Sequence, residues 1–297
     1  HFHFSDGQQL APTVFGETDS TTGEWKIKTS PSFTLGNNGF TILKDGNTIT
    51  DQSSNSNDFT LGAGTLTNLQ DCPNNVFATW NTLLRNNAYA GQNLPTNVNS
   101  TFVSGETGTN YPTYVSTLGA SSGKYYFECK MGSSGGAGAM IGITDSTDRN
   151  SYFGSGAQDY GYFGDNGKKY IKGASGATYG NSFGNNDIIG CAVDLDNSKL
   201  YFHKNGTYQD SGDPTSGSTG TGAISIDAPS STNTGFYFFA AGDAGNSDAP
   251  TVNANFGNGY FGTTAISSEG TNASSIGKFE YDVPTGYTAL STKGLNE

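Results

Sequence analysis

The chain has 297 residues, of which 43 are Gly, 19 are Phe and 16 are Tyr, and only 33% are hydrophobic. This composition predicts many turns and short strands around an aromatic core, in a chain long enough for one large or two modest domains without disulfide bonds. The formal net charge of -12 argues against nucleic acid as a partner, because phosphate contacts need clustered Lys and Arg and the chain has 14 of them, scattered.

Residues 1–35 show little periodicity beyond residues 1–4, which alternate like a strand already in progress. We expect an N-terminal arm, or the remnant of a preceding β-module, in which Phe15 and Trp25 anchor the arm to a neighbour. The chain begins at His1 and not at Met, so we expect a fragment, a processed product or the ordered part of something longer. No apolar run approaches the roughly 18 residues of a membrane span, and we expect no membrane insertion.

Residues 36–117 contain only short strand candidates, separated by clusters of Asn, Ser, Asp and Gly that are typical of loops. The candidates lie near residues 39–43, 58–61 and 76–80. This pattern predicts an irregular β-rich connecting region that leads into the next domain. No part of the chain shows an apolar stripe of helical period, so we expect few and short helices.

From residue 118 to residue 297 the pattern sharpens into strands at intervals suited to a β-sandwich, followed by a C-terminal extension. Alternation within these strands predicts the core side chains, and the candidates are Tyr126, Ile141, Ile143, Val193, Leu195, Tyr201 and Phe238. The clearest feature is the stretch D-I-I-G-C-A-V-D-L-D-N-S-K-L-Y-F-H-K-N-G at 187–206, which predicts a complete β-hairpin with turn chemistry at 196–198. Asn205-Gly206 then predicts another turn.

This hairpin resembles the hallmark hairpin of SPRY domains, and the resemblance extends over roughly residues 75–290. G-K-Y-Y-F-E-C-K at 123–130 and I-G-I-T-D at 141–145 are similar to two early strands of the family, and Y-G-Y-F-G-D-N-G-K-K-Y at 160–170 to the strand and hairpin that follow. The resemblance implies an all-β fold, an antiparallel β-sandwich of the SPRY, concanavalin-like type. It also implies a protein that binds other molecules through its loops and has no catalytic activity.

A second, narrower resemblance concerns D-G-Q-Q-L-A-P-T-V-F-G-E-T-D near the start, D-C-P-N-N-V-F-A-T-W-N at 71–81 and the C-terminal tail. These strings are similar to connecting segments in structural proteins of marine tailed bacteriophages. Residues 44–57 depart from those proteins, because they lack the fuller D-x-S-G-N-G-N-x-W motif. The resemblance implies a virion component on the surface of an extracellular particle.

The candidate catalytic and metal-binding patterns all have structural alternatives. Two G-x-S-x-G matches, at 119–123 and 132–136, lack the strand-turn-helix context of a nucleophile elbow. Asp194 and Asp196 lie on one side of a predicted strand and could flank a glycosidic bond, but acidic residues are common beside tight turns. We expect no catalytic residue, no metal and no cofactor.

The three cysteines, Cys72, Cys129 and Cys191, lie far apart without metal-binding or redox spacing. Cys129 and Cys191 fall within strand patterns, which favours buried free thiols. We expect all three thiols to be reduced and free of metal.

The predicted binding surface is the set of loops. Arg149, Tyr152 and Phe153 lie between two strand candidates, and Tyr111 and Tyr114 belong to another loop. Arginine and rigid amphipathic rings are typical of recognition loops, and aromatic rings also stack on sugars. The alternative interpretation is that Tyr152 and Phe153 cover the end of the sandwich.

These patterns favour a non-enzymatic virion module, most simply a tail-fibre or appendage protein that binds a host-surface glycan or a neighbouring virion protein. We expect a homo-oligomer, which would be a trimer in a tail fibre. Three alternatives stay open: a capsid decoration or head-fibre protein, an appendage glycan hydrolase, and a cellular SPRY adaptor that docks peptides.

Overall fold

A computed structural model covers the chain and describes residues 2–20, 23, 25–28, 30–44, 48–64, 70–71, 75–84, 93–98, 100–104, 112–145, 152–244 and 249–296. The chain folds as two compact units, His1–Asn75 and Val76–Glu297. In the described ranges, helix is limited to short 3-10 turns: η1 (Pro12–Val14), η2 (Gly136–Gly138), η3 (Gln209–Ser211), η4 (Pro214–Thr219), η5 (Pro229–Ser231) and η6 (Gly294–Asn296). Few and short helices were expected, and none of those described is long and apolar enough to cross a membrane.

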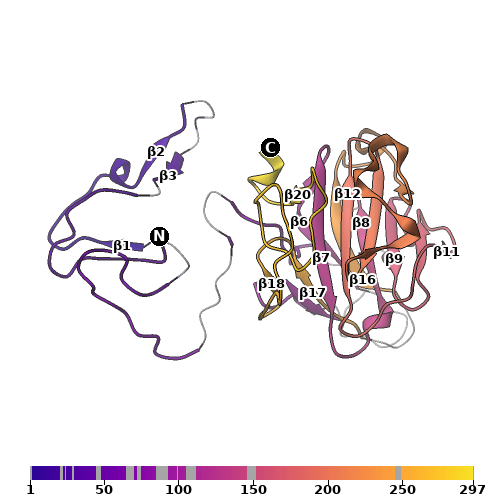
Figure 1. Cartoon of the computed structure of the whole chain (residues 1–297), viewed down its shortest axis with the longest axis horizontal. Helices are drawn as coiled ribbons and strands as arrows, with labels where there is room; N and C mark the ends of the chain where they lie inside the picture. The colour runs from indigo at the N-terminus through magenta and orange to yellow at the C-terminus, as the bar shows by residue number, and fades with distance from the viewer. Residues whose placement is uncertain are drawn as a thin grey trace. The chain divides into compact units, whose positions relative to one another are not determined.

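The second unit is a β-sandwich, drawn in Figure 1 as two stacked layers of strands. One layer is a six-stranded sheet in the order β11 (Ala177–Thr178), β10 (Lys168–Ile171), β9 (Asp159–Phe163), β8 (Ala139–Thr144), β16 (Tyr237–Asp243) and β6 (Thr113–Ala120). The other is an eight-stranded sheet with the main path β14 (Thr207–Tyr208), β13 (Lys199–Lys204), β12 (Ile188–Asp194), β7 (Lys124–Met131), β17 (Thr251–Asn255) and β5 (Thr101–Val103). Strand β15 (Ile224–Ser225) pairs with β13, and β20 (Thr288–Ala289) runs parallel to β7. The predicted all-β sandwich is confirmed.

The hairpin of β12 and β13 forms as the sequence predicted. Its register runs from the pair Ile189–Lys204 to the pair Asp194–Lys199. Asn205 and Gly206 take positive φ values of 48° and 83° in the turn that leads to β14. Successive positive φ values are what an Asn-Gly turn supplies at little steric cost, so this turn follows from local sequence alone.

Aromatic side chains fill the space between the two sheets. Phe127 of β7 stacks on Phe256 with ring centroids 5.3 Å apart and lies 4.2 Å from Phe239 of β16. Trp80 packs edge-on against Phe256 at 5.1 Å. All four rings are buried, so aromatic residues carry the core as the composition predicted.

The expected core residues are buried with one exception. The buried ones are Tyr126, Ile141, Ile143, Val193, Leu195 and Tyr201. Phe238 is only half-buried, because its neighbours Tyr237 and Phe239 are the buried rings of β16 and side chains alternate along a strand. The prediction therefore chose the wrong face of β16.

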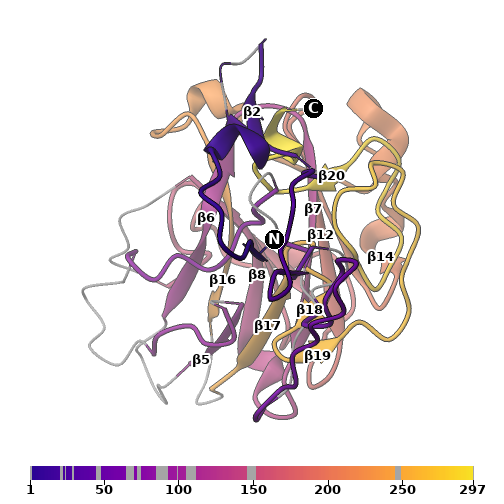
Figure 2. The ribbon, with the colours of Figure 1, turned by 90° about the vertical axis from the view of Figure 1, so that its left-hand side faces the viewer.

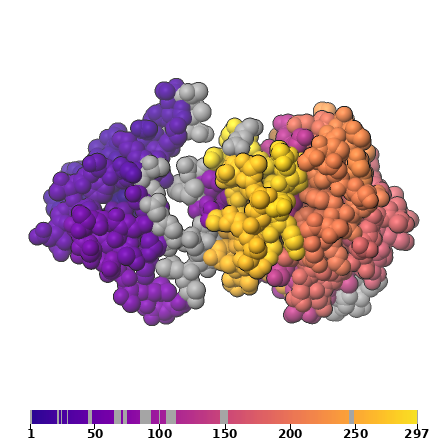
Figure 3. Space-filling model, viewed as in Figure 1, coloured from indigo at the N-terminus to yellow at the C-terminus, as the bar shows by residue number. Residues whose placement is uncertain are grey.

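The face of the eight-stranded sheet that points away from the inter-sheet core is covered by the C-terminal segment. This segment, yellow in Figures 2 and 3, includes β20, which pairs with β7, and Phe279, whose ring meets Tyr126 edge-on at 5.0 Å. The same segment contains a small ribbon of β18 (Tyr260–Phe261) and β19 (Thr264–Ala265). Tyr126 and Glu128, which alternate away from Phe127 in the middle of β7, are therefore also closed to solvent.

The first unit contains two two-stranded sheets, β1 (Phe2–Phe4) with β4 (Phe40–Ile42) and β2 (Gly16–Thr18) with β3 (Trp25–Ile27). Phe15 packs edge-on against Phe33 within this unit at 5.1 Å. Trp25, the second expected anchor, is 52% exposed.

The unit boundary differs from the boundaries expected after residues 35 and 117. It falls between Asn75 and Val76, inside the stretch that the sequence indicated as one connecting region. Trp80 and Phe102 explain the difference, because both are buried in the core of the sandwich unit with ring centroids 5.7 Å apart.

Candidate functional site

The structure describes three of the five predicted recognition residues, whereas Arg149 and Tyr111 lie outside the described ranges. Tyr152 is half-buried. Phe153 and Tyr114 have exposed fractions of 0% and 1%. Rings buried to this extent offer no face to a partner, so a recognition role for Phe153 and Tyr114 does not fit their placement.

A carboxylate fixes the loop that carries Phe153. Asp159 Oδ2 accepts hydrogen bonds from the backbone N–H groups of Gly154 and Gly156, both at 2.9 Å. Phe153 then packs in a small apolar cluster with Met140, Phe163 and Ala240, separate from the main core. The ring covers part of the sandwich, which corresponds to the alternative interpretation of this motif.

Tyr114 lies in strand β6 and not in a loop. Its ring stacks on Phe102 with centroids 3.9 Å apart, and its hydroxyl donates to the Asn93 carbonyl at 2.9 Å. Pro112 lies just before the strand. The strand begins at Thr113, directly after this proline, so Tyr114 belongs to the strand and not to the loop that the sequence predicted.

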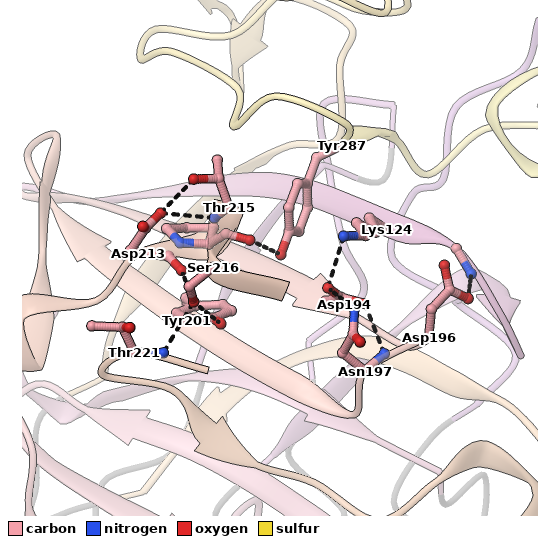
Figure 4. A network of polar contacts seen from close by, with 12 residues as sticks. Lys124, Asp194, Asp196, Asn197, Tyr201, Asp213, Thr215, Ser216, Thr221 and Tyr287 are labelled. Atoms are coloured by element: carbon pink, nitrogen blue, oxygen red, sulfur yellow. Dashed lines mark hydrogen bonds and ion pairs between the residues drawn. The ribbon is translucent and has the colours of Figure 1, made fainter. Parts of the chain in front are cut away.

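The carboxylates of Asp194 and Asp196, at the hairpin turn, make hydrogen bonds and an ion pair within the protein, as Figure 4 shows. Asp194 is fully buried and its Oδ2 lies 2.9 Å from Lys124 Nζ, while Asn197 donates to both of its oxygens at 2.9 and 2.8 Å. Asp196 lies beyond the end of β12, and its Oδ1 accepts from the Gly123 backbone N–H at 2.8 Å. The expectation that both acids lie on one strand is therefore wrong at Asp196.

The same network extends over the 3-10 turn η4 (Figure 4). The Tyr287 hydroxyl donates to the Pro214 carbonyl at 3.1 Å, and Tyr201 Oη lies 3.3 Å from Ser216 Oγ. Lys124 Nζ also lies 5.8 Å from the centre of the Tyr287 ring. These contacts connect the hairpin, η4 and the C-terminal segment at this end of the sandwich.

A shallow apolar hollow lies between the two sheets near this polar network. Its lining includes Tyr125, Ile143, Val193, Leu195, Phe239 and Leu290. Its volume of about 10 Å³ admits little more than one water-sized group. Phe236, which is 45% exposed, precedes the lining residue Tyr237 in the chain. The hollow suits a small apolar group.

A buried polar chain on the outer face of the eight-stranded sheet was missed by the sequence analysis. Gly206 N–H donates to His203 Nδ1 at 3.1 Å, so the ring proton lies on Nε2, which is 2.6 Å from Tyr126 Oη. The Tyr126 hydroxyl in turn donates to Glu128 Oε1 at 2.9 Å. His203 and Glu128 are both almost fully buried.

Glu128 also holds the C-terminal segment. Its carboxylate accepts from the backbone N–H groups of Glu280 at 2.9 Å and Tyr281 at 2.8 Å, and from Asn255 Nδ2 at 3.4 Å. Burial raises the pKa of Glu128 to about 7 against the opposing effect of these donors. Burial lowers the pKa of His203 to about 3, which keeps the imidazole neutral.

Cys129 and Cys191 are buried free thiols, and burial raises the pKa of both. Cys72 lies outside the described residues. Within the described part of the chain, no three His, Cys, Asp or Glu side chains are grouped so that they could hold a metal ion.

Residues 124–221 match the family model of the SPRY domain, so the sandwich contains a SPRY domain. The chain is 42% identical over 89 residues to a Drosophila melanogaster Ran-binding proteins 9/10 homolog, which is 29% of this chain and 9% of that protein. It is 39% identical over 89 residues to human Ran-binding protein 9, of which the match covers 12%. The SPRY domain of human HERC1 aligns with 59% of this chain and 96% of its own, at 15% identity and a TM-score of 0.43.

These comparisons correct the expected function. The interpretation as a bacteriophage tail-fibre or appendage protein for host attachment is wrong, as is the location on a virion, because the matching segments belong to cellular Ran-binding proteins. The matched segment spans only about a tenth of the Drosophila and human proteins. The SPRY part of the expectation is confirmed.

Proposed function

We propose that this chain is a peptide-docking module of a cellular protein and has no catalytic activity of its own. The observation that carries the proposal is the SPRY match over residues 124–221, together with identity of about 40% to segments of proteins named for binding another protein. The cellular SPRY adaptor was one of the alternatives that the sequence left open.

The end of the sandwich with the hairpin turn is the surface that we assign to docking. The turn at Asp194 and Asp196 is held by hydrogen bonds from backbone N–H groups to the two carboxylates, so its backbone is pre-organised. The apolar hollow and the exposed ring of Phe236 lie at the strand ends beside it. A rigid scaffold that presents an aromatic ring next to an apolar depression is a suitable anchor site for a short segment.

The chemistry of the partner follows from charge and size. The chain carries a net charge of -12, which attracts a basic segment over long range. The hollow has room for a small apolar group only. We therefore propose a segment with a small aliphatic side chain flanked by Lys or Arg. The expectation of a homo-oligomer stays a prediction.

Two features support a role without catalysis. The carboxylate pair that was weighed for glycoside hydrolysis is divided between a buried ion pair and a turn, so it lacks the free acid and base that the reaction needs. His203, buried and bonded at both ring nitrogens, has no open path to a substrate.

The test selects binders for the full chain from a yeast-displayed random peptide library and measures their affinity. Phe236→Ala should weaken the selected peptides by about tenfold, as for an anchor residue. The matched control is Leu83→Ala, which removes a side chain that is 89% exposed elsewhere. Selection of no peptide, or peptides that bind Phe236→Ala and wild type equally, would contradict the proposed surface.

A further inference from the structure

A β-ribbon in the first unit exposes an apolar face to solvent. Strands β1 and β4 pair Phe2 with Ile42 and Phe4 with Phe40, so these four side chains share one face of the ribbon. Phe2 and Phe4 have exposed fractions of 54% and 45%, while Phe40 and Ile42 are half-buried. The apolar face of an antiparallel sheet normally packs on a core, and an exposed apolar patch marks a site of interaction.

The opposite face of this ribbon packs inside the unit. His3 lies across from Thr41, and His3 Nδ1 is 2.9 Å from Thr41 Oγ1. The His3 ring stacks on Phe15 and meets Phe33 edge-on, both with centroids 5.4 Å apart. Because these contacts fix which side chains face inward, the phenylalanine side chains of β1 and β4 stay on the outer face.

The exposed rings form an ordered group, which we call the phenylalanine row: Phe2, Phe40, Phe4 and Phe59. The Phe40 ring stacks on Phe2 at 5.6 Å and on Phe4 at 5.5 Å, with interplanar angles of 24° and 23°. Phe59, which is 45% exposed, meets Phe40 edge-on at 4.6 Å. The rings hold one another in place, so the surface is formed before a partner binds.

Acidic residues flank the Phe4–Phe40 end of the row. Asp6 follows Phe4 by two residues, and its Oδ2 accepts from Asn38 Nδ2 at 2.8 Å, beyond the last pair of the ribbon. Asp58 is exposed and directly precedes Phe59.

The charge balance of the unit agrees with this placement. Residues 1–75 contain eight Asp or Glu and three Lys in the sequence. One of these cations, Lys44, follows Ile42 by two residues and so lies toward the other end of the ribbon. The Phe4 end is therefore the end that attracts a cationic partner.

The area of the row limits the size of the partner. At roughly 200 Å² for a phenylalanine, the exposed parts of Phe2, Phe4 and Phe59 amount to about 300 Å². A stable interface between two copies of the chain needs about 800 Å² on each partner. The row is too small for such a dimer, and it fits a few residues of an extended segment.

We propose that the Phe4 end of the phenylalanine row binds an arginine-containing segment of a partner protein. The guanidinium group stacks on the Phe4 ring, and the charges of Asp6 and Asp58 attract it. Arginine suits this surface better than lysine, because a guanidinium group is planar and weakly hydrated, whereas an ammonium group is a strongly hydrated point charge.

The probe is the peptide Gly-Arg-Gly-Arg-Gly, which lacks the aliphatic side chain proposed for the hollow of the sandwich. Citrulline in place of both arginines removes the charge and keeps the shape, and lysine keeps the charge without the planar group. Binding to the full chain is measured by calorimetry and by saturation-transfer NMR at low salt. The arginine peptide should bind with millimolar or better affinity, and each of the two control peptides at least threefold more weakly.

Variants at the two ends of the row test the location. Phe4→Leu keeps an apolar side chain without the ring and should weaken the arginine peptide at least threefold. The matched control is Phe2→Leu, at the other end of the row, which should change the affinity by less than twofold. Phe236→Ala, in the sandwich, should leave the affinity unchanged.

Asp58→Asn tests the charge. The variant keeps an acceptor for the Asp51 backbone N–H, which donates to Asp58 Oδ1 at 2.9 Å. Binding of the arginine peptide should weaken about twofold, and its decrease with added salt should become smaller. If Phe4→Leu fails to fold, as judged by circular dichroism, this variant decides, and wild-type affinity with wild-type salt dependence would overturn the proposal.

Other results would also overturn it: no saturable binding of the arginine peptide at millimolar concentration, equal binding of the arginine peptide and either control peptide, or equal affinities of Phe2→Leu and Phe4→Leu. A dimer in sedimentation equilibrium that Phe4→Leu dissociates would make a second copy the occupant instead. Docking at the sandwich depends on Phe236 and a different unit, so the failure of either proposal leaves the other standing.

Discussion

Strand β7 builds two kinds of core on its two faces. Toward the six-stranded sheet it places Phe127 among aromatic rings, and away from it Tyr126 and Glu128 in a hydrogen-bonded chain with His203. Both faces are buried, so burial does not distinguish them. The difference lies in what closes each face: a second sheet packed through apolar contacts, or a C-terminal segment in which the N–H groups of Glu280 and Tyr281 bind a buried carboxylate. We infer that apolar area stabilises the first face at any pH, whereas the stability of the second face also depends on the protonation of Glu128 and His203.

The largest expected effect tests the inner face. Phe127→Ala removes a fully buried ring that contacts Phe239 and Phe256 and should cost about 3–5 kcal/mol in the free energy of unfolding. The loss should be equal at pH 5 and pH 8, since the rings around it do not titrate. Urea unfolding at both values measures this, with Leu83→Ala as the exposed control. A loss that varies with pH would remove the distinction between the two faces.

The next effect concerns the outer face. Glu128→Ala leaves the N–H groups of Glu280 and Tyr281, two half-buried residues, without their acceptor, and we expect the free energy of unfolding to fall by about 2–4 kcal/mol. Hydrogen exchange should show those two amides losing protection before the strands of the inner core, because they open with the C-terminal segment. If both regions exchange together in the variant, the carboxylate does not hold the segment separately.

The pH dependence of the outer face contains two opposing contributions. Glu128 has a folded pKa of about 7, above its ordinary 4.5, so it binds more protons in the folded state and its contribution to stability falls as pH rises from 4.5 to 7. His203 has a folded pKa of about 3, below its ordinary 6.5, so its contribution is complete above pH 6.5 and is lost as pH falls toward 3. Between pH 4.5 and pH 6.5 the two contributions change stability with pH in opposite directions, so they cancel.

Single substitutions should uncover each slope. In His203→Gln only the Glu128 contribution remains, and the free energy of unfolding should fall by about 1–3 kcal/mol as pH rises from 4.5 to 7. In Glu128→Gln only the His203 contribution remains, and the free energy of unfolding should instead fall by about 1–3 kcal/mol as pH decreases from 6.5 to 4.5. The measurement is urea unfolding of both variants across this range. Slopes of the same sign in the two variants would contradict the assignment.

Local sequence was enough to predict the hairpin and most of the inner core. The Asn205-Gly206 turn depends only on the conformations of two adjacent residues. The alternation of apolar residues correctly predicted that Ile141 and Ile143 face the core. Alternation failed at Phe238, where four aromatic residues in succession, at 236–239, allow either face to be the buried one. A period of two cannot choose between faces that are equally apolar.

The outer face and the loops depend on contacts between distant residues. Glu128 and Glu280 are separated by 152 positions, and Phe153 is buried because Asp159 shapes its loop. One signal for the polar chain was present: Tyr126 and Glu128 alternate with Phe127, so a charged residue shares a strand face with a core candidate. Because a charge on a buried face needs partners, this combination predicts a hydrogen-bonded site even when the partners are unknown.

The smallest expected effect extends the comparison to the hairpin end. Asp194, like Glu128, is a buried carboxylate, but it pairs with Lys124, whose side chain is 26% exposed, whereas the four donors to Glu128 are neutral. Asp194→Asn keeps an acceptor for the Asn197 backbone N–H and removes the charge, so we expect a loss of about 1–2 kcal/mol. Salt screens a partly exposed pair, so the loss should shrink in concentrated NaCl, while that of Glu128→Ala should not.

Asp196→Asn, which retains its acceptor for Gly123 in an exposed turn, is the matched control and should change stability by less than about 0.5 kcal/mol. Equal salt dependence of the Asp194 and Glu128 variants would mean that the cation is irrelevant and that both acids are held by hydrogen bonds alone.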